Sequence, residues 1–346
     1  MSTDSFILRE VETALRHLLT DQRHRWQAVN TLLSTVFDEL EVLVLSGGKR
    51  LRPQFLHWGW VAAGGDPTEV GHHSFGAAIE LLHAFALFHD DVIDDAHTRR
   101  GHETTHRRLA RHHEEDALAG ESRRFGEGSA VLIGDIAYSL ADFLMKELPN
   151  EARPYWNELR LEMNVGQYLD TLGSAIRERS LEHAHSVSRL KTAKYTVERP
   201  LHIGAMAAHA ENAQALLHTL SAYGIPLGTA FQLRDDVLGA FGNESVTGKS
   251  VGGDFHEAKP TALLAFAYQN ANPQELQVLQ RVGERELSPE DIEAIQNVIL
   301  DTKALEKTEA LIVSLRDQAV ASITEMKSEA RTELEKLAVA VTDRSV

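Results

Sequence analysis

Two acidic segments hold the residues in this sequence that are best suited to chemistry. The first, HDDVIDD at 89–95, follows an apolar run at 74–88 that predicts a largely buried helix. Asp90 and Asp94 would then share one face, about 6 Å apart along the axis, where their charges repel. The second, FQLRDDVL at 231–238, repeats the apolar lead-in and the Asp pair. One such segment could be a solvated helix end, but two on separate helices suit Mg²⁺, which takes oxygen ligands and bridges to phosphates.

Basic residues accompany the acidic segments. GGKRLRP at 47–53 combines two glycines, which free the backbone, with three cations, so this segment could be either a phosphate clamp or a solvated basic turn. Arg99 and Arg100 follow the first acidic segment. They could neutralise its carboxylates, or they could bind an anion whose opposite side contacts the metal ions. Bidentate guanidinium–phosphate geometry favours the second role. Lys191 and Lys194 lie three residues apart and could be either solvated or anion-binding.

Composition limits the classes of partner. The 346 residues carry a net charge of −16, which argues against nucleic acid and against an anionic membrane surface. The sequence has no cysteine, no basic-then-apolar leader and no uncharged apolar run long enough to span a membrane, so we expect a cytoplasmic protein without a transmembrane segment. Its 18 histidines show no HExxH spacing, and we interpret most of them as surface or core residues.

Helical periodicity runs through most of the chain, and no alternating strand pattern stands out. We therefore predict an all-α fold: a single-domain bundle of ten or more helices around a central cavity, with the acidic segments facing each other across it. Polar residues 102–125 suggest a mobile surface insertion that could act as a lid. The expected helices are two within 5–45, then 55–63, one starting at Asp66-Pro67-Thr68-Glu69, 130–148, 156–176, 181–209 interrupted at Pro200, 213–238, one starting at Ser288-Pro289, and a long one at about 303–340.

These features together indicate one reaction. Metal ions and cations can stabilise a departing diphosphate, and an apolar helical pocket can keep the resulting carbocation-like centre away from water. An allylic diphosphate is a substrate that would leave in this way.

On these residues the chain resembles the trans-isoprenyl diphosphate synthases, the polyprenyl synthetase family, over about residues 40–265. GGKRLRP, HDDVIDD, Lys191-Thr192 and the FQxxDD element at 231–236 stand in the order typical of that family. The resemblance implies one isoprenoid synthase domain over 1–346, about three Mg²⁺ per active site, isopentenyl and allylic diphosphates as substrates, and a homodimer.

The resemblance also implies roles for individual residues. Metal ligands would be Asp90, Asp94 and Asp235, with Lys191 and Lys249 as further catalytic residues. Isopentenyl diphosphate would be held by Lys49, Arg52, His83 and Arg100. The allylic diphosphate would be held by Arg99, Lys191, Thr192, Gln232, Lys249 and Lys259.

Two departures from the family pattern stand out. The second motif ends in Gly239 where an Asp is usual, so the second metal site has less charge, although its first Asp is present. Residues 107–123 are also longer than the usual connection.

Product length would depend on the residues just before the first acidic segment. Phe85 lies five residues before Asp90, about one and a half turns deeper, and its neighbour Ala86 is small. One aromatic there, without an insertion in the motif, resembles the pattern that forms C20 geranylgeranyl diphosphate. A C15 or a longer product is the alternative if Phe85 is only a core residue. Less favoured readings are a class I terpene cyclase, which has no need of the GGKRLRP clamp, and a non-catalytic regulatory subunit.

Overall fold

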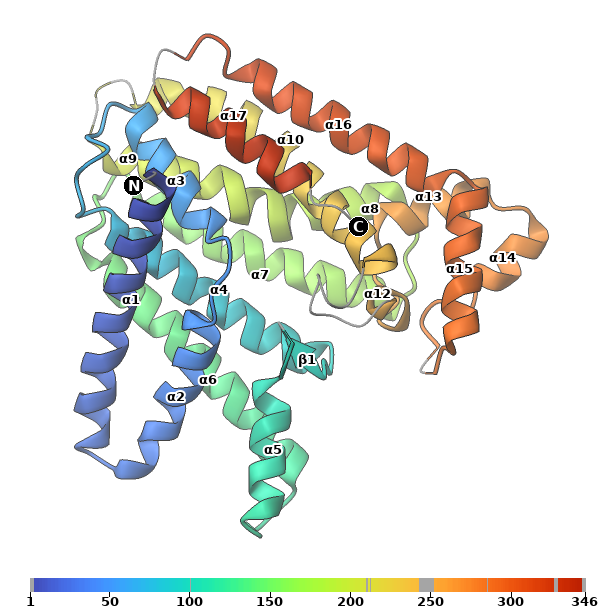
Figure 1. Cartoon of the computed structure of the whole chain (residues 1–346), viewed down its shortest axis with the longest axis horizontal. Helices are drawn as coiled ribbons and strands as arrows, with labels where there is room; N and C mark the ends of the chain where they lie inside the picture. Colours follow the sequence, from blue (N-terminus) through green and yellow to red (C-terminus); the bar gives the residue numbers. More distant parts are fainter. Residues whose placement is uncertain are drawn as a thin grey trace.

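The computed structural model describes residues 3–99, 101–209, 211, 213–242, 252–284, 286–326 and 329–343. Helices dominate these ranges (Figure 1), which confirms the all-α prediction with more than ten helices. The described strands are β1 (Thr98–Arg99) and β2 (His102–Glu103), a two-residue antiparallel pair directly after the first acidic segment. The helices are α1 Thr3–Gln27, α2 Ser34–Leu45, α3 Leu51–Ala62, α4 His73–Ile93, α5 Thr105–Glu115, α6 Ser122–Leu144, α7 Arg153–Ala175, α8 Leu181–Val187, α9 Arg199–Ala207, α10 Ala213–Phe241, α12 Gly253–His256, α13 Ala262–Asn270, α14 Pro273–Leu279, α15 Pro289–Asp301, α16 Ala304–Ser322 and α17 Glu329–Thr342, with short turns η1 Thr31–Leu33 and η2 Met145–Glu147 and a π-helix, η3, Ser188–Glu198.

Helix α4 is the element around which the others gather. It packs against α1, α2, α3 and α6, and its side chains are buried on nearly every face because residues 74–88 are predominantly apolar. Its C-terminal end carries Asp90 and Asp91, and Asp94 caps it. Carboxylates there face the negative end of the helix dipole, so the fold concentrates negative charge at this point.

The segment before Pro200 is a π-helix, η3, rather than an α-helix. It lies between α7 and α10. Both helices approach it so closely that a Cβ at Gly166 of α7 or at Gly228 of α10 would clash with the backbone of η3. The wider turn of a π-helix is frequent at functional sites. Helix α9 begins immediately afterwards, with Pro200 in its first turn, where the missing N–H costs nothing.

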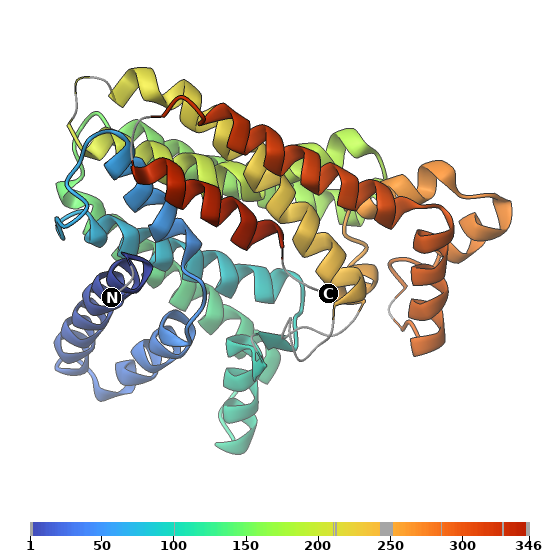
Figure 2. The same ribbon diagram turned by 45° about the horizontal axis from the view of Figure 1, so that its top comes forward.

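Long helices α10 and α16 run side by side across one face of the molecule (Figure 2), while α14 and α15 stand at the far end of α16. Buried apolar residues form a large cluster around α1–α4, α6, α7, α9 and α10, with a second cluster among α12–α15. In the part of the chain that the structure describes, the segment Ser122–Glu147 is long and apolar enough to cross a membrane, with 39% of its most apolar stretch buried. A core helix passes the same test, so this composition is weak evidence for a membrane span.

Two helix predictions were wrong. Asp66-Pro67-Thr68-Glu69 forms a turn, because the Asp66 carboxylate accepts bonds from the backbone N–H (2.8 Å) and hydroxyl (2.7 Å) of Thr68, and α4 starts later at His73. The helix expected at 303–340 is two helices, because α16 ends at Ser322 and the chain turns around buried Ile323.

Residues 102–125, where we expected a mobile surface insertion, are mostly helical. They form β2, α5 and the start of α6, and α5 packs along α6. Leu109 and His113 of α5 are buried, and Arg108 donates to Glu39 of α2 (2.9 Å from Nε). The many charged residues indicated solvent exposure, but they occupy only the outer face of a packed helix.

Candidate active site

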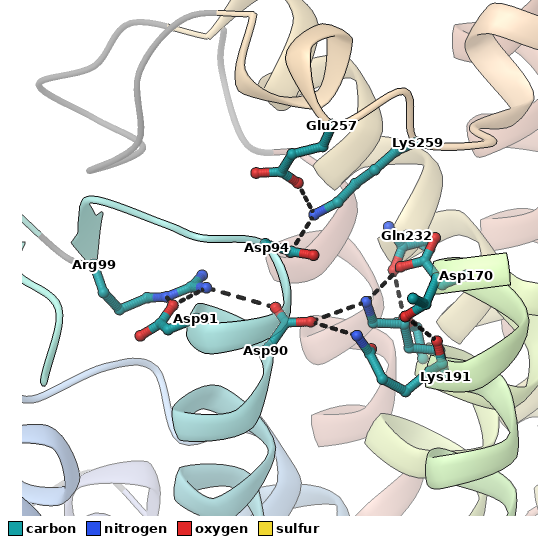
Figure 3. Close-up of polar contacts among 12 residues, drawn as sticks. Asp90, Asp91, Asp94, Arg99, Asp170, Lys191, Gln232, Glu257 and Lys259 are labelled. Carbon is teal, nitrogen blue, oxygen red and sulfur yellow. Dashed lines mark hydrogen bonds and ion pairs between the residues drawn. The ribbon is translucent and has the colours of Figure 1, made fainter. Parts of the chain in front are cut away.

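The first acidic segment is surrounded by cations that come from other parts of the chain (Figure 3). Arg99, on β1, lies over the end of α4, 2.8 Å from Asp91 and 3.5 Å from Asp90. Lys259, which follows α12, lies 3.0 Å from Asp94. Burial lowers the pKa of Lys259, but the carboxylates of Asp94 and its neighbours outweigh it and hold that pKa well above the usual range. The cation therefore remains charged inside the site.

Helices α7 and η3 supply the next layer of contacts. Lys191 lies 2.6 Å from Asp170 and 3.3 Å from Asp90, and Gln167 donates to Asp90 at 2.9 Å. Burial lowers the pKa of Lys191, and the charges of Asp90 and Asp170 more than restore it, so the net direction is upward. Gln167 and Asp170 are three apart on α7 and thus point to the same side.

The second acidic segment joins the same network. Thr192 of η3 donates to Gln232 on α10, and Gln232 donates to Asp236 at 2.8 Å. Burial raises the pKa of Asp236 to about 8, and the charges of Asp254, Asp235 and Asp170 add to that rise, although the bond from Gln232 opposes it. Asp235 itself is half-buried.

Gly239 faces a carboxylate from another element. A Cβ on Gly239 would meet the carboxylate of Asp254 on α12. The backbone also joins the two elements, because the N–H of Gly252 lies 3.3 Å from the carbonyl of Gly239. Asp254 thus brings a negative charge to the place where the second motif lacks its last Asp.

A second group of predicted residues meets around Tyr195, on η3. The Arg52 guanidinium lies 4.4 Å from the centre of the Tyr195 ring and donates to Thr196 at 3.0 Å. The ring of His83 lies 6.2 Å from that of Tyr195. The Tyr195 hydroxyl is buried and makes no hydrogen bond with the described residues, and burial raises its pKa. These groups could hold a second anion beside the first site.

Arg50 and Lys194 take structural positions instead. Arg50 is buried against Glu80 (2.7 Å) and the carbonyl of Val44 (2.7 Å), so it is not the third cation of a clamp. Lys194 pairs with Glu162 of α7. Lys49 lies in the loop before α3, where its carbonyl accepts from Gln54 at 2.6 Å.

Phe85 lies on the side of α4 that faces α6. Its ring is 5.0 Å from that of Tyr138 on α6 and 4.4 Å from that of His89, while Ala86 beside it is half-buried. Phe85 thus lies in contact with a second aromatic ring about one and a half turns before Asp90 on α4.

The structure leaves two predicted positions unplaced and adds several others. Arg100 and Lys249 lie outside the described residues. Sequence reasoning did not assign Gln167, Asp170, Tyr195, Asp254 or Glu257, which contacts Lys259 at 2.6 Å. Gln167 and Asp170 could have been identified from the sequence, because an amide and a carboxylate three residues apart lie on the same face of a helix.

The donor set fits a hard divalent cation. Asp90, Asp94 and Asp235 are oxygen donors, and the cations that now approach the first two could instead contact phosphate oxygens. These three carboxylates offer oxygen alone, whereas softer metals prefer nitrogen and sulfur ligands.

Comparisons with known proteins agree with this site. The profile of the polyprenyl synthetase family matches residues 34–299. The geranylfarnesyl diphosphate synthase of Aeropyrum pernix is 30% identical over 277 residues, which cover 78% of this chain and 80% of that protein. The farnesyl diphosphate synthase of Geobacillus stearothermophilus is 32% identical over 281 residues, which cover 74% and 86%.

A solved structure resembles the whole chain. The geranylgeranyl pyrophosphate synthase of Corynebacterium glutamicum, in complex with isoprenyl diphosphate and magnesium, has a TM-score of 0.94 and 35% identity, with 100% of both chains covered. The family match spans well over half of the sequence, and the fold is shared from end to end. This chain belongs to the polyprenyl synthetase family and is a prenyltransferase of isoprenoid biosynthesis.

Proposed function

We propose that this chain condenses isopentenyl diphosphate head-to-tail with allylic diphosphates in the presence of Mg²⁺, and that its main product is geranylgeranyl diphosphate. The observation that carries the proposal is the convergence of Arg99, Lys191 and Lys259 on Asp90 and Asp94. Cations from three distant segments around two carboxylates suit a diphosphate that is bridged to the protein by divalent ions.

Each residue of the allylic side then has a defined task. Bound Mg²⁺ would neutralise charge on the departing diphosphate. Asp90, Asp94 and Asp235 would hold the ions, while Arg99, Lys191 and Lys259 would bind the phosphate oxygens, with Lys249 as a further cation. Gln232 and Thr192, linked to each other, would orient the same group. Asp170 and Gln167 hold Lys191 and Asp90 in place.

The second anion group fits isopentenyl diphosphate. Arg52 and His83 lie around Tyr195, and Lys49 lies in the loop just before α3. Arg100, next to Arg99 in the chain, would complete the set. This arrangement would hold the second substrate beside the allylic carbon that loses its diphosphate.

Asp254 supports the metal assignment despite Gly239. We infer that its carboxylate replaces the charge missing from the second motif, because it occupies the space that a longer side chain at position 239 would need. The second cluster then keeps three carboxylates, Asp235, Asp236 and Asp254.

Product length rests on the Phe85 and Tyr138 pair. A growing chain that enters between α4 and α6 would stop at these rings. Relatives of similar identity include a farnesyl and a geranylfarnesyl synthase, so the family alone leaves the length open. The position of Phe85 supports the C20 product.

We further propose that the chain forms a homodimer. Helix α7 exposes Leu161, Val165, Tyr168 and Leu172, which repeat at helical spacing, and Tyr168 is 68% exposed. Helix α6 exposes Leu132 and Phe143, at 63% and 50%. Rows of large apolar side chains on the surface mark contact sites, and a second copy would cover them.

Product analysis tests the function. The purified chain is incubated with Mg²⁺, isopentenyl diphosphate and, in turn, the C5, C10 and C15 allylic diphosphates. Mainly C20 from all three primers is expected, and removing Mg²⁺ with a chelator should abolish turnover. Asp90→Asn should also abolish it.

Other outcomes would overturn parts of the proposal. Products that stop at C15 or run well past C20 would reject Phe85 as the barrier. Cyclisation of a primer would instead indicate a class I terpene cyclase. Elongation of none of the primers would indicate a non-catalytic regulatory subunit.

A further inference from the structure

Three histidines meet in the core where α3 gives way to α4. His57 lies on α3, His72 directly precedes α4, and His73 is its first residue. All three are buried, and ligand nitrogens of the three rings lie within 4.8 Å of one another. Asp90 stands near the other end of α4, roughly 25 Å along the axis, so the cluster is separate from the active site.

Each ring has one buried nitrogen that makes no hydrogen bond with the described residues: Nε2 of His57, Nδ1 of His72 and Nε2 of His73. The remaining nitrogens are in contact. Nδ1 of His57 lies 2.9 Å from Nε2 of His72, and Nδ1 of His73 lies 3.2 Å from the carbonyl of Val70. Nε2 of His73 is therefore open to a ligand, and Nδ1 of His57 and Nε2 of His72 face each other closely enough for one ion to lie between them.

The protonation of the rings suits a metal. A carbonyl can only accept, so His73 donates from Nδ1 and presents a lone pair at Nε2. An imidazole that ligates a metal is commonly oriented by such a bond from its other nitrogen.

We propose that His57, His72 and His73 form a structural site for one Zn²⁺ ion, which fastens α3 to the start of α4. Its ligand atoms would be Nδ1 of His57, Nε2 of His72 and Nε2 of His73. Zinc bonds of about 2.0–2.1 Å place tetrahedral ligand nitrogens roughly 3.3 Å apart, so the first two nitrogens, which lie 2.9 Å apart, need to separate by only a few tenths of an ångström. Glu10 on α1 attracts charge on His73 and supplies a nearby negative group; it or a water fills the fourth position.

Aromatic rings close the surroundings of the site. Trp60 stacks on His72 with centroids 4.6 Å apart, and Phe6 of α1 meets His73 edge-on at 5.5 Å. An apolar enclosure favours retention of a bound ion. Nitrogen ligands in such a site select Zn²⁺ over the Mg²⁺ that the carboxylate site prefers.

The proposal is tested by measuring the metal content of the purified 346-residue chain. After exposure to ZnCl₂ and dialysis against Mg²⁺ buffer, about one zinc per chain is expected by mass spectrometry. CoCl₂ should give the visible absorption bands of a tetrahedral site. Excess Zn²⁺ should raise the Tm by about 2–5 °C.

Variants separate this site from the active site. Asp90→Asn, which removes a proposed Mg²⁺ ligand, should retain the zinc, whereas His57→Gln and His73→Gln should lose it and the Tm shift. Zinc uptake that survives His73→Gln, or that disappears in Asp90→Asn, would reject the site. If the histidine variants fail to fold, the wild-type chain decides: no cobalt bands and no retained zinc would also reject it.

Discussion

Asp170 shows how a residue away from the first acidic segment can control it. It lies 2.6 Å from Lys191, whose ammonium is also 3.3 Å from Asp90. Without Asp170, the lysine would turn fully toward Asp90 and compete with a metal ion. A carboxylate on α7 thereby keeps a cation of η3 available for phosphate.

Asp170→Asn should reduce kcat/KM by about 10–100-fold, because a bond between charged groups contributes about 1.5–3 kcal/mol. The Mg²⁺ concentration for half-maximal rate should rise as well. Steady-state kinetics across a Mg²⁺ series measure both. Asp116→Asn, an exposed change after α5, serves as the control, and equal kinetics for the two variants would contradict the positioning role.

Phe85→Ala should lengthen the product beyond C20, because it removes one ring of the barrier next to Tyr138. Combination with Tyr138→Ala should lengthen it further. Chromatography of the dephosphorylated products gives the readout. Phe75→Ala, a buried aromatic near the other end of α4, controls for lost core packing and should leave the product unchanged.

Gly239→Asp should lower the free energy of unfolding by about 2 kcal/mol, because it forces two carboxylates together at Asp254. Asp254→Asn in the same chain should restore much of the loss and the activity. Urea melts with and without Mg²⁺ measure this. Gly239→Ala separates crowding from charge, and a Gly239→Asp chain that is fully stable and active would refute the replacement by Asp254.

At the scale of elements, α4 was predictable and η3 was not. A predominantly apolar run without proline indicates that α4 is a buried helix. Residues 188–198 carry too few turns for the sequence to distinguish a π-helix from an α-helix, and the glycines that make room for it lie on other helices. The break after Ser322 was missed because no glycine or proline marks it. Local sequence patterns therefore predicted where helices occur. The positions at which the helices end depend on packing between helices, which these patterns do not contain.

The same distinction holds for the site. The motifs indicated Asp90, Asp94, Lys191 and Lys259 because these residues stand in recognisable segments. Asp170 and Asp254 gain their meaning only from contacts across 15 residues of chain or more, and such contacts leave no local pattern.

The contact of His202 on α9 with Leu217 on α10 predicts that the stability of the fold depends on pH. Burial lowers the pKa of His202 to about 4, and its Nε2 lies 3.3 Å from the carbonyl of Leu217. In the unfolded chain a histidine has a pKa of about 6.5, so below that pH the unfolded state binds the extra proton. Stability is therefore complete above pH 6.5 and falls as the pH drops toward 4.

His202→Gln should weaken this dependence. Between pH 7 and 5 its free energy of unfolding should fall by about 2 kcal/mol less than that of the wild type. Urea melts at both pH values give the comparison, and His112→Gln, an exposed change, is the control. Equal losses in wild type and His202→Gln would show that other groups set the dependence.

For the whole molecule, the proposed homodimer would be held together by the apolar rows on α6 and α7. Leu161→Glu together with Tyr168→Glu should convert the proposed dimer into monomer, because charges in an apolar interface are expensive to bury. Light scattering after size exclusion measures the mass. Leu300→Glu, on exposed α15, should leave it unchanged. A wild type that is already monomeric would reject the dimer.

The contact between Lys259 and Asp94 joins residues 165 positions apart. At about 5–20 residues per second, a ribosome needs roughly 10–30 s to make that stretch. During this interval α4 can form with its acidic end exposed, while its later counter-charges are still unsynthesised. A ribosome-stalled chain that ends before α10 should therefore have helices but no substrate affinity. The catalytic centre is among the last parts of the molecule to become complete, and chains released early would be inert rather than partly active.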